Sequence, residues 1–163
     1  MLSQAYIAFI LNGIFQACIL VILVAAAVKD ARDWEVPLRY TNPLFFLGIV
    51  VMLVRLVSEG DVYPVLVSAF ILWAYSRRWL NAADTKLQIA LWGLWPLAGL
   101  VGMAAVGLWG LVMTLRKQGD QRFPAVVPLA IGSGLTFVLQ YLIIFSVRAG
   151  SFLEGFYLLF QLA

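Results

Sequence analysis

Long apolar runs, separated by short polar segments, follow one another along the whole chain. The runs cover residues 2–28, 44–57, 62–75, 81–95, 97–115 and 123–147, and a shorter apolar stretch covers residues 152–162. A helix needs roughly 20 mostly apolar residues to cross the hydrocarbon core of a bilayer. The unbroken apolar run over 87–115 is long enough to fold back at Trp95-Pro96, where proline disfavours a continuous helix. The pattern therefore predicts an all-α membrane helix bundle. It would have about six transmembrane helices and a short C-terminal apolar segment, built as a single integral-membrane domain over residues 1–163.

The composition agrees with a membrane location and removes several kinds of chemistry. Apolar residues make up 64% of the sequence and charged residues 12%, whereas soluble domains have about 45–50% and about 25%. There is no histidine and Cys18 is the single cysteine, which excludes His-based triads, an internal disulfide, iron–sulfur clusters and Cys-rich zinc sites. The net charge of +3 is too small to indicate a nucleic-acid partner. We therefore expect a lipid bilayer as the surroundings, with no metal and no cofactor.

The basic residues alternate along the predicted loops. Nine of the eleven Lys and Arg residues follow the first, third and fifth spans: Lys29, Arg32, Arg39, Arg77, Arg78, Lys86, Arg116, Lys117 and Arg122. Short loops rich in Lys and Arg remain in the cytoplasm. The alternation therefore predicts that these three loops are cytoplasmic and that the N-terminus lies outside.

Two of the eight acidic residues differ from the rest because they adjoin apolar helices at the predicted cytoplasmic side. Asp30 ends the first span and Asp84 begins the fourth, whereas the other carboxylates fall in turns or at the membrane interface. An ionisable group at membrane depth is costly and indicates a functional site. Gln88 follows Asp84 by one helical turn, and the spacing of Asn12, Gln16 and Asp30 predicts a polar stripe facing the bundle interior.

A pair of carboxyl groups in an apolar bundle has a defined acid–base chemistry. Close together they do not both ionise, so one stays protonated near neutral pH. The ionised partner can then draw a proton from water while the acid hydrogen-bonds a peptide carbonyl, which is hydrolysis of the aspartic-protease type. A pair of membrane aspartates can equally bind an ion or pass protons. On spacing alone both interpretations stay open.

Three stretches of the chain resemble motifs of one enzyme family. Residues 30–37, DARDWEVP, resemble its first motif, an Asp followed seven residues later by the Pro of an Ile/Val/Leu-Pro pair. Residues 81–87, NAADTKL, resemble its second motif, Gly-x-Gly-Asp-x-Lys-Leu at the start of a membrane helix. Residues 124–132, PAVVPLAIG, resemble the Pro-rich start of a late span. The family is that of the type IV prepilin peptidases, which are GxGD-type membrane aspartic proteases. The small size is most similar to the short members that serve Flp-type (tight adherence) pili.

The resemblance implies roles for individual residues. Asp30 and Asp84 fall on the two catalytic aspartates, Lys86 on the Lys of the second motif and Pro37 on the Pro of the first. The expected supporting residues of the pair are Lys86, Pro37, Gln88 and Asn81.

Three positions depart from the family pattern. Asn81 and Ala83 replace the two glycines of the second motif, and Leu38 stands where the first motif has Asn or Asp. Glycine permits close backbone approach and unusual dihedral angles, and Asn tolerates left-handed geometry better than most residues. These departures bear on substrate fit and rate, because the two aspartates themselves are present.

The activity that the resemblance implies is removal of the short basic leader from a type IV pilin-like precursor. The partner is that prepilin, and cleavage takes place at the cytoplasmic face of the bacterial inner membrane. No separate soluble or methyltransferase domain is expected, so the activity is that of an endopeptidase alone. The alternatives are a non-enzymatic ion- or proton-coupling subunit, a scaffold subunit of a membrane assembly, and an inactive relative of the peptidases.

Overall fold

Six α-helices account for the regular structure of the described residues. The computed structural model describes the backbone of residues 4–33, 35–77, 79–116 and 124–161, and the side chains of residue 7 and residues 9–143 within those ranges. The helices are α1 (Gln4–Asp33), α2 (Leu38–Glu59), α3 (Tyr63–Ser76), α4 (Ala82–Leu94), α5 (Pro96–Leu115) and α6 (Val126–Gln161). The prediction of an all-α bundle is thereby confirmed, with the helices in the expected order.

Four of the six helices are long and apolar enough to cross a bilayer. They contribute the segments Phe9–Asp33 of α1, Leu38–Glu59 of α2, Pro96–Leu115 of α5 and Val126–Ile143 of α6. The helices α3 and α4 have 14 and 13 residues, which is about 20 Å of helix against a hydrocarbon core of about 30 Å. The chain is therefore a membrane protein in which two of the six predicted spans are shorter than a full crossing.

The break between α4 and α5 lies where Pro96 predicts it. Pro96 is the first residue of α5, a position where its missing N–H leaves no helical hydrogen bond unmade. Trp95 separates the two helices with an extended φ of −153°. The Trp95 side chain is buried, and its Nε1 donates a hydrogen bond of 3.3 Å to Gln140 Oε1 of α6. The fold-back is thus tied to the last helix.

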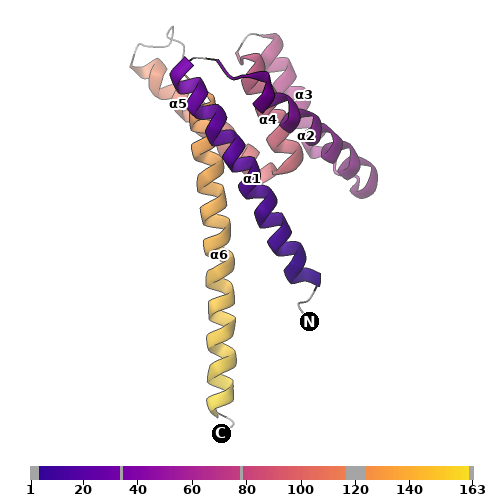
Figure 1. Cartoon of the computed structure of the whole chain (residues 1–163), viewed down its shortest axis with the longest axis vertical. Helices are drawn as coiled ribbons and strands as arrows, with labels where there is room; N and C mark the ends of the chain where they lie inside the picture. The colour runs from indigo at the N-terminus through magenta and orange to yellow at the C-terminus, as the bar shows by residue number, and fades with distance from the viewer. Residues whose placement is uncertain (1–3, 34, 78, 117–123, 162–163) are drawn as a thin grey trace.

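The C-terminal apolar segment forms the end of the last helix. The backbone of α6 continues as a single helix of 36 residues to Gln161. Residues 148–151 contain no proline, so no residue there removes a helical hydrogen bond. Figure 1 shows the C-terminal part of α6 reaching well beyond the other helices.

The helices form two groups that meet at α4 and α5. Figure 1 shows α1, α5 and α6 together on one side and α2, α3 and α4 on the other. Nine of the 13 residues of α4 are buried, because α2, α3 and α5 all pack against it. The C-terminal ends of α1 and α5 and the N-terminal ends of α2 and α4 lie at one end of the molecule (Figure 1). We call this end, which carries residues 30–33, 35–41, 77, 79–84 and 116, the loop end.

Glycines set the closest helix contacts on both sides of the bundle. A Cβ on Gly48 of α2 would lie 2.6 Å from Ala90 Cα of α4. A Cβ on Gly132 of α6 would lie 2.8 Å from Gly102 Cα of α5. Small residues at such positions let membrane helices approach through their backbones. These two contacts hold α4 against α2 and α6 against α5, and so position the loop end.

Candidate active site

Asp30 lies in the last turn of α1 and is held by the start of α6. Its side chain is 9% exposed, and Oδ2 accepts a hydrogen bond of 3.0 Å from the backbone N–H of Val126, 96 residues further along the chain. Val126 is the first residue of α6. Backbone N–H groups at a helix start have no partner within the helix and attract negative charge. The carboxylate is therefore fixed by a helix start that is distant in sequence.

Asp84 lies in the first turn of α4, three residues after Asn81, the residue that precedes the helix. It is 8% exposed, and hydrogen bonds from the backbone and side chain of Asn81 reach its carboxylate. An acidic side chain at this position commonly turns back to the residue before the helix. The Asn81 carbonyl in turn accepts bonds from Thr85, 3.0 Å from its backbone N and 2.8 Å from Oγ1. The first turn of α4 thus fixes the Asp84 side chain.

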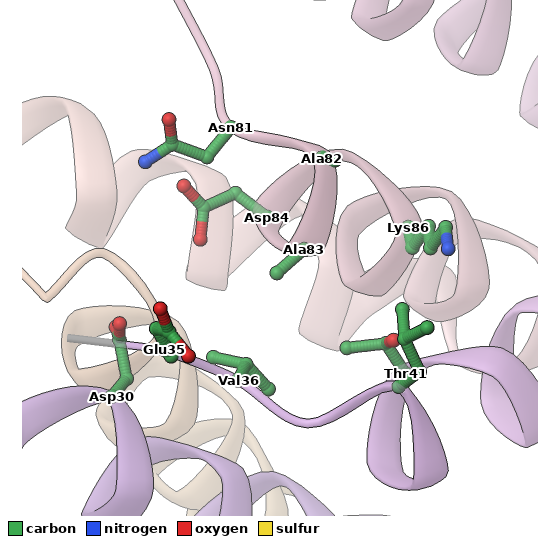
Figure 2. Close-up of a pocket in the computed structure, with 10 residues that line it drawn as sticks. Asp30, Glu35, Val36, Thr41, Asn81, Ala82, Ala83, Asp84 and Lys86 are labelled. Carbon is green, nitrogen blue, oxygen red and sulfur yellow. The ribbon is translucent and has the colours of Figure 1, made fainter. Parts of the chain in front are cut away.

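The two carboxyl groups face a single pocket at the loop end. The pocket has a volume of about 410 Å³, and its walls come from the end of α1, residues 35–41 and the start of α4. Figure 2 shows Asp30 and Asp84 reaching it from opposite walls with their carboxyl groups turned toward each other. The fold therefore brings together the two aspartates that the sequence marks out.

The surroundings of Asp84 favour its protonated form. Burial raises the pKa of Asp84 to about 6, the negative charge of Asp30 adds to the effect, and the hydrogen bonds from Asn81 oppose it. Asp84 lies outside the four helices that are long enough to span a bilayer. Within the described part of the chain, no Lys or Arg forms an ion pair with either aspartate. A carboxyl group that titrates near neutral pH beside a second carboxylate is suited to acid–base work.

The expected supporting residues divide into two pairs. Asn81 and Lys86 line the pocket, whereas Pro37 and Gln88 do not. Lys86 Nζ donates a hydrogen bond of 2.9 Å to Asn42 Oδ1, so this ammonium group is engaged with α2. Pro37 immediately precedes α2 and is half-buried. Gln88 is buried one turn beyond Asp84, and its Oε1 has no hydrogen-bond partner among the described residues.

The polar stripe predicted along α1 is only partly present. Gln16 and Asp30 are buried as expected, but Asn12 is exposed. At this level Tyr141 of α6 packs against Phe9 and Gly13 of α1. The prediction is therefore wrong for Asn12, because the face of α1 that meets α6 here carries Phe9 and Gly13 rather than Asn12.

Two further pocket residues, Glu35 and Thr41, are not singled out by the sequence. Glu35 is exposed, as expected for a loop residue, but it stands on the pocket wall beside Asp30 (Figure 2). Thr41 is fully buried, and its hydroxyl has no hydrogen-bond partner among the described residues. Thr41 shares the buried face of α2 with Leu44 and Gly48, and this spacing is typical of one face of a helix. The burial of Thr41 could not be predicted from it, because the predicted span begins only at residue 44.

A scan against protein-family models, a search of curated proteins and a search of solved structures each found no match to this chain. The chemistry of the site therefore follows from its own groups. Across the described residues there is no cluster of three or more His, Cys, Asp or Glu side chains that could hold a metal ion. Two buried carboxyl groups at an open pocket can hold one proton between them and exchange it with water or a peptide.

Proposed function

We propose that this chain is a membrane-embedded aspartic endopeptidase of the type IV prepilin peptidase kind. Asp30 and Asp84 are its catalytic pair, and its substrate is the precursor of a small pilin-like protein of the Flp type. The enzyme lies in the bacterial cytoplasmic membrane with its N-terminus outside, and it removes the basic leader at the cytoplasmic face. The observation that carries the proposal is the convergence of two buried aspartates, from separate helices, on one pocket (Figure 2).

The charge of the pocket supports a basic substrate segment. Asp30, Asp84 and Glu35 give the lining three carboxyl groups. Lys86 is the one basic side chain among the described lining residues, and it is bonded to Asn42. A site lined by one sign of charge attracts ligands of the opposite sign. A leader rich in Lys or Arg is thus drawn toward the aspartate pair.

Hydrolysis at this pair needs one ionised and one protonated carboxyl group. The ionised group takes a proton from water, the water oxygen attacks the scissile carbonyl carbon, and the protonated group gives its proton to the carbonyl oxygen. In the second step the first group protonates the nitrogen, the C–N bond breaks, and the second group recovers a proton from the gem-diol. Both groups return to their starting states. The raised pKa of Asp84 favours it as the proton holder at the outset.

Conversion of each aspartate to asparagine tests the proposal. We expect Asp30→Asn and Asp84→Asn each to slow leader removal by about 10³-fold or more, because the amide neither gives nor takes the proton. The measurement is co-expression with a Flp-type pilin precursor, with the loss of the leader followed as a gel shift.

Asp33→Asn is the matched control for this experiment. Asp33 lies on α1 one turn from Asp30, but it is exposed and pairs with Lys29 at 3.0 Å. We expect normal processing with this variant, and equal membrane abundance for all three. Normal cleavage by Asp84→Asn would refute the assignment. Uncleaved precursor with the unmodified chain, together with cation-dependent stability that either Asn variant removes, would identify an ion-binding pair instead.

A further inference from the structure

A buried hydroxyl on the pocket wall has no partner within the protein. Thr41 is 0% exposed and its Oγ1 lacks a hydrogen bond among the described residues, yet the residue lines the pocket. Helical Ser and Thr hydroxyls can bond the carbonyl four residues earlier. Thr85, Ser133 and Thr136 do so here, at 2.8 to 2.9 Å. Thr41 differs from these because its buried hydroxyl bonds no carbonyl or other polar group among the described residues.

The position of Thr41 relates this hydroxyl to the aspartate pair. Figure 2 shows Thr41 and Lys86 at one end of the pocket and the two aspartates at the other, with Val36 between them along the wall. Lys86 makes no hydrogen bond to the Thr41 hydroxyl; its Nζ donates to Asn42 on α2. A chain segment lying along Val36 would therefore meet the carboxyl groups at one end and the hydroxyl at the other.

The chemistry of a hydroxyl narrows the class of ligand. A threonine hydroxyl can donate one hydrogen bond and accept others. An extended polypeptide presents both a donor and an acceptor at each residue, the N–H and the C=O. A buried polar group without a partner destabilises the protein, and a ligand that supplies the missing bond removes that cost.

We infer that Thr41 is a substrate-binding residue whose hydroxyl hydrogen-bonds the backbone of the peptide lying in the aspartate pocket. This inference rests on the proposed function, because it takes the pocket to be a peptide site. Thr41 supplies a fixed anchor on α2 that adds to the binding of the peptide in the pocket.

Thr41→Val tests the inference through two separate readouts, the thermal midpoint and KM. Valine keeps the shape and removes the hydroxyl. Without substrate we expect an unchanged or higher thermal midpoint, because no protein hydrogen bond is lost. With a Flp-type pilin precursor in nanodiscs we expect KM to rise about 10-fold with little change in kcat. The reason is that the variant loses one hydrogen bond to the substrate, and this bond is equally strong in the bound substrate and in the transition state. Thr41→Ser keeps a hydroxyl and should restore KM.

Thr136→Val is the matched control. Thr136 is also a buried helical threonine, but its hydroxyl is bonded to Gly132 and the residue lies outside the aspartate pocket. We expect Thr136→Val to lower the thermal midpoint and leave KM unchanged. A lowered midpoint with normal KM for Thr41→Val would make its hydroxyl structural and overturn the inference.

Binding to the inactive Asp84→Asn protein separates the inference from the proposed function. We expect Thr41→Val in that background to weaken the Kd for the same precursor about 10-fold. Equal Kd values would overturn the role of Thr41 while leaving the peptidase intact. A chain that neither binds nor cleaves a Flp-type precursor would refute the proposed function, and the inference with it.

Discussion

Asp84 shows, for a single residue, how a reactive carboxyl group lowers the stability of the fold. Its pKa is raised from 3.8 to about 6 by burial and by Asp30. The folded chain therefore holds the Asp84 proton more tightly than the unfolded chain does. Because ionisation opposes folding, the stability associated with this group is present below about pH 4 and is lost as the pH rises through about 6. Groups perturbed in this way are concentrated at functional sites.

We predict that Asp84→Asn stabilises the protein at neutral pH. The amide does not ionise, so the free energy of unfolding should rise by up to about 3 kcal/mol at pH 8. This figure corresponds to a shift of about two pKa units at about 1.4 kcal/mol for each unit. At pH 4 the variant and the unmodified chain should be nearly equal. Thermal unfolding in detergent, followed by tryptophan fluorescence from pH 4 to pH 8, measures the difference.

Asp33→Asn provides the comparison for this pH series. The Asp33 side chain is 45% exposed beside Lys29, so water already solvates its charge. We expect no comparable gain from this variant. A difference between Asp84→Asn and the unmodified chain that does not change with pH would contradict the account of Asp84.

The sequence identifies the two aspartates of the site but not its buried hydroxyl. Asp30 and Asp84 can be predicted because a carboxyl group next to an apolar run is costly and rare. Thr41 cannot be recognised in the same way, since threonine is common in helices of every kind and its role depends on a missing partner. Asn12 shows the opposite error, because its polarity and spacing suggest burial that the fold does not provide.

At the scale of the helices, hydropathy predicts the apolar centres well and the polar ends poorly. The division at Pro96 agrees with the structure because proline acts locally. The first helix runs on to Asp33 and the second begins at Leu38, although both of these ends are polar. A charged terminal turn and a loop look alike in hydropathy. The site is built from such turns, so its backbone could not be predicted from the apolar runs.

The α2–α4 contact gives a prediction at this scale. We expect Gly48→Ala to lower stability by about 1–3 kcal/mol, because the new methyl group would overlap the Ala90 backbone and push α2 away from α4. Since α2 carries Thr41 and α4 carries Asp84, leader removal should fall about 10- to 100-fold. Thermal unfolding and the precursor gel shift measure the two effects.

Gly110→Ala is the matched control for the α2–α4 contact. Gly110 lies on α5, and a Cβ there would meet nothing within 4 Å. We expect this variant to keep full activity and stability. Normal activity with Gly48→Ala would mean that the pocket does not depend on the close approach of α2 to α4.

Over the whole molecule, the site depends on contacts that no local pattern encodes. Asp30 is held by Val126 N–H, which requires the start of α6 to lie against the end of α1. Asp84 reaches the same pocket only because α4 is enclosed by α2, α3 and α5. The sequence predicts that both aspartates lie on the same side of the membrane. It does not predict which helices are neighbours, because every helix here is apolar and fits several partners.

The distribution of charge between the two ends of the molecule predicts its orientation. Lys29, Arg32 and Arg77 lie at the loop end with the pocket, whereas at the α2–α3 turn Arg55 is paired with Glu59 and Asp61. Because Lys and Arg near short loops stay in the cytoplasm, the pocket should open there.

Cysteine labelling in whole cells tests this orientation in a chain in which Cys18 is replaced by serine. Ala82→Cys places a thiol at the exposed start of α4 on the pocket wall, and Val62→Cys places one at the α2–α3 turn. A membrane-impermeant maleimide should label the Val62 variant in intact cells and the Ala82 variant only after permeabilisation. The reverse result would put the aspartates on the outer face, out of reach of a cytoplasmic leader, and would exclude the proposed substrate whatever the chemistry of the pair.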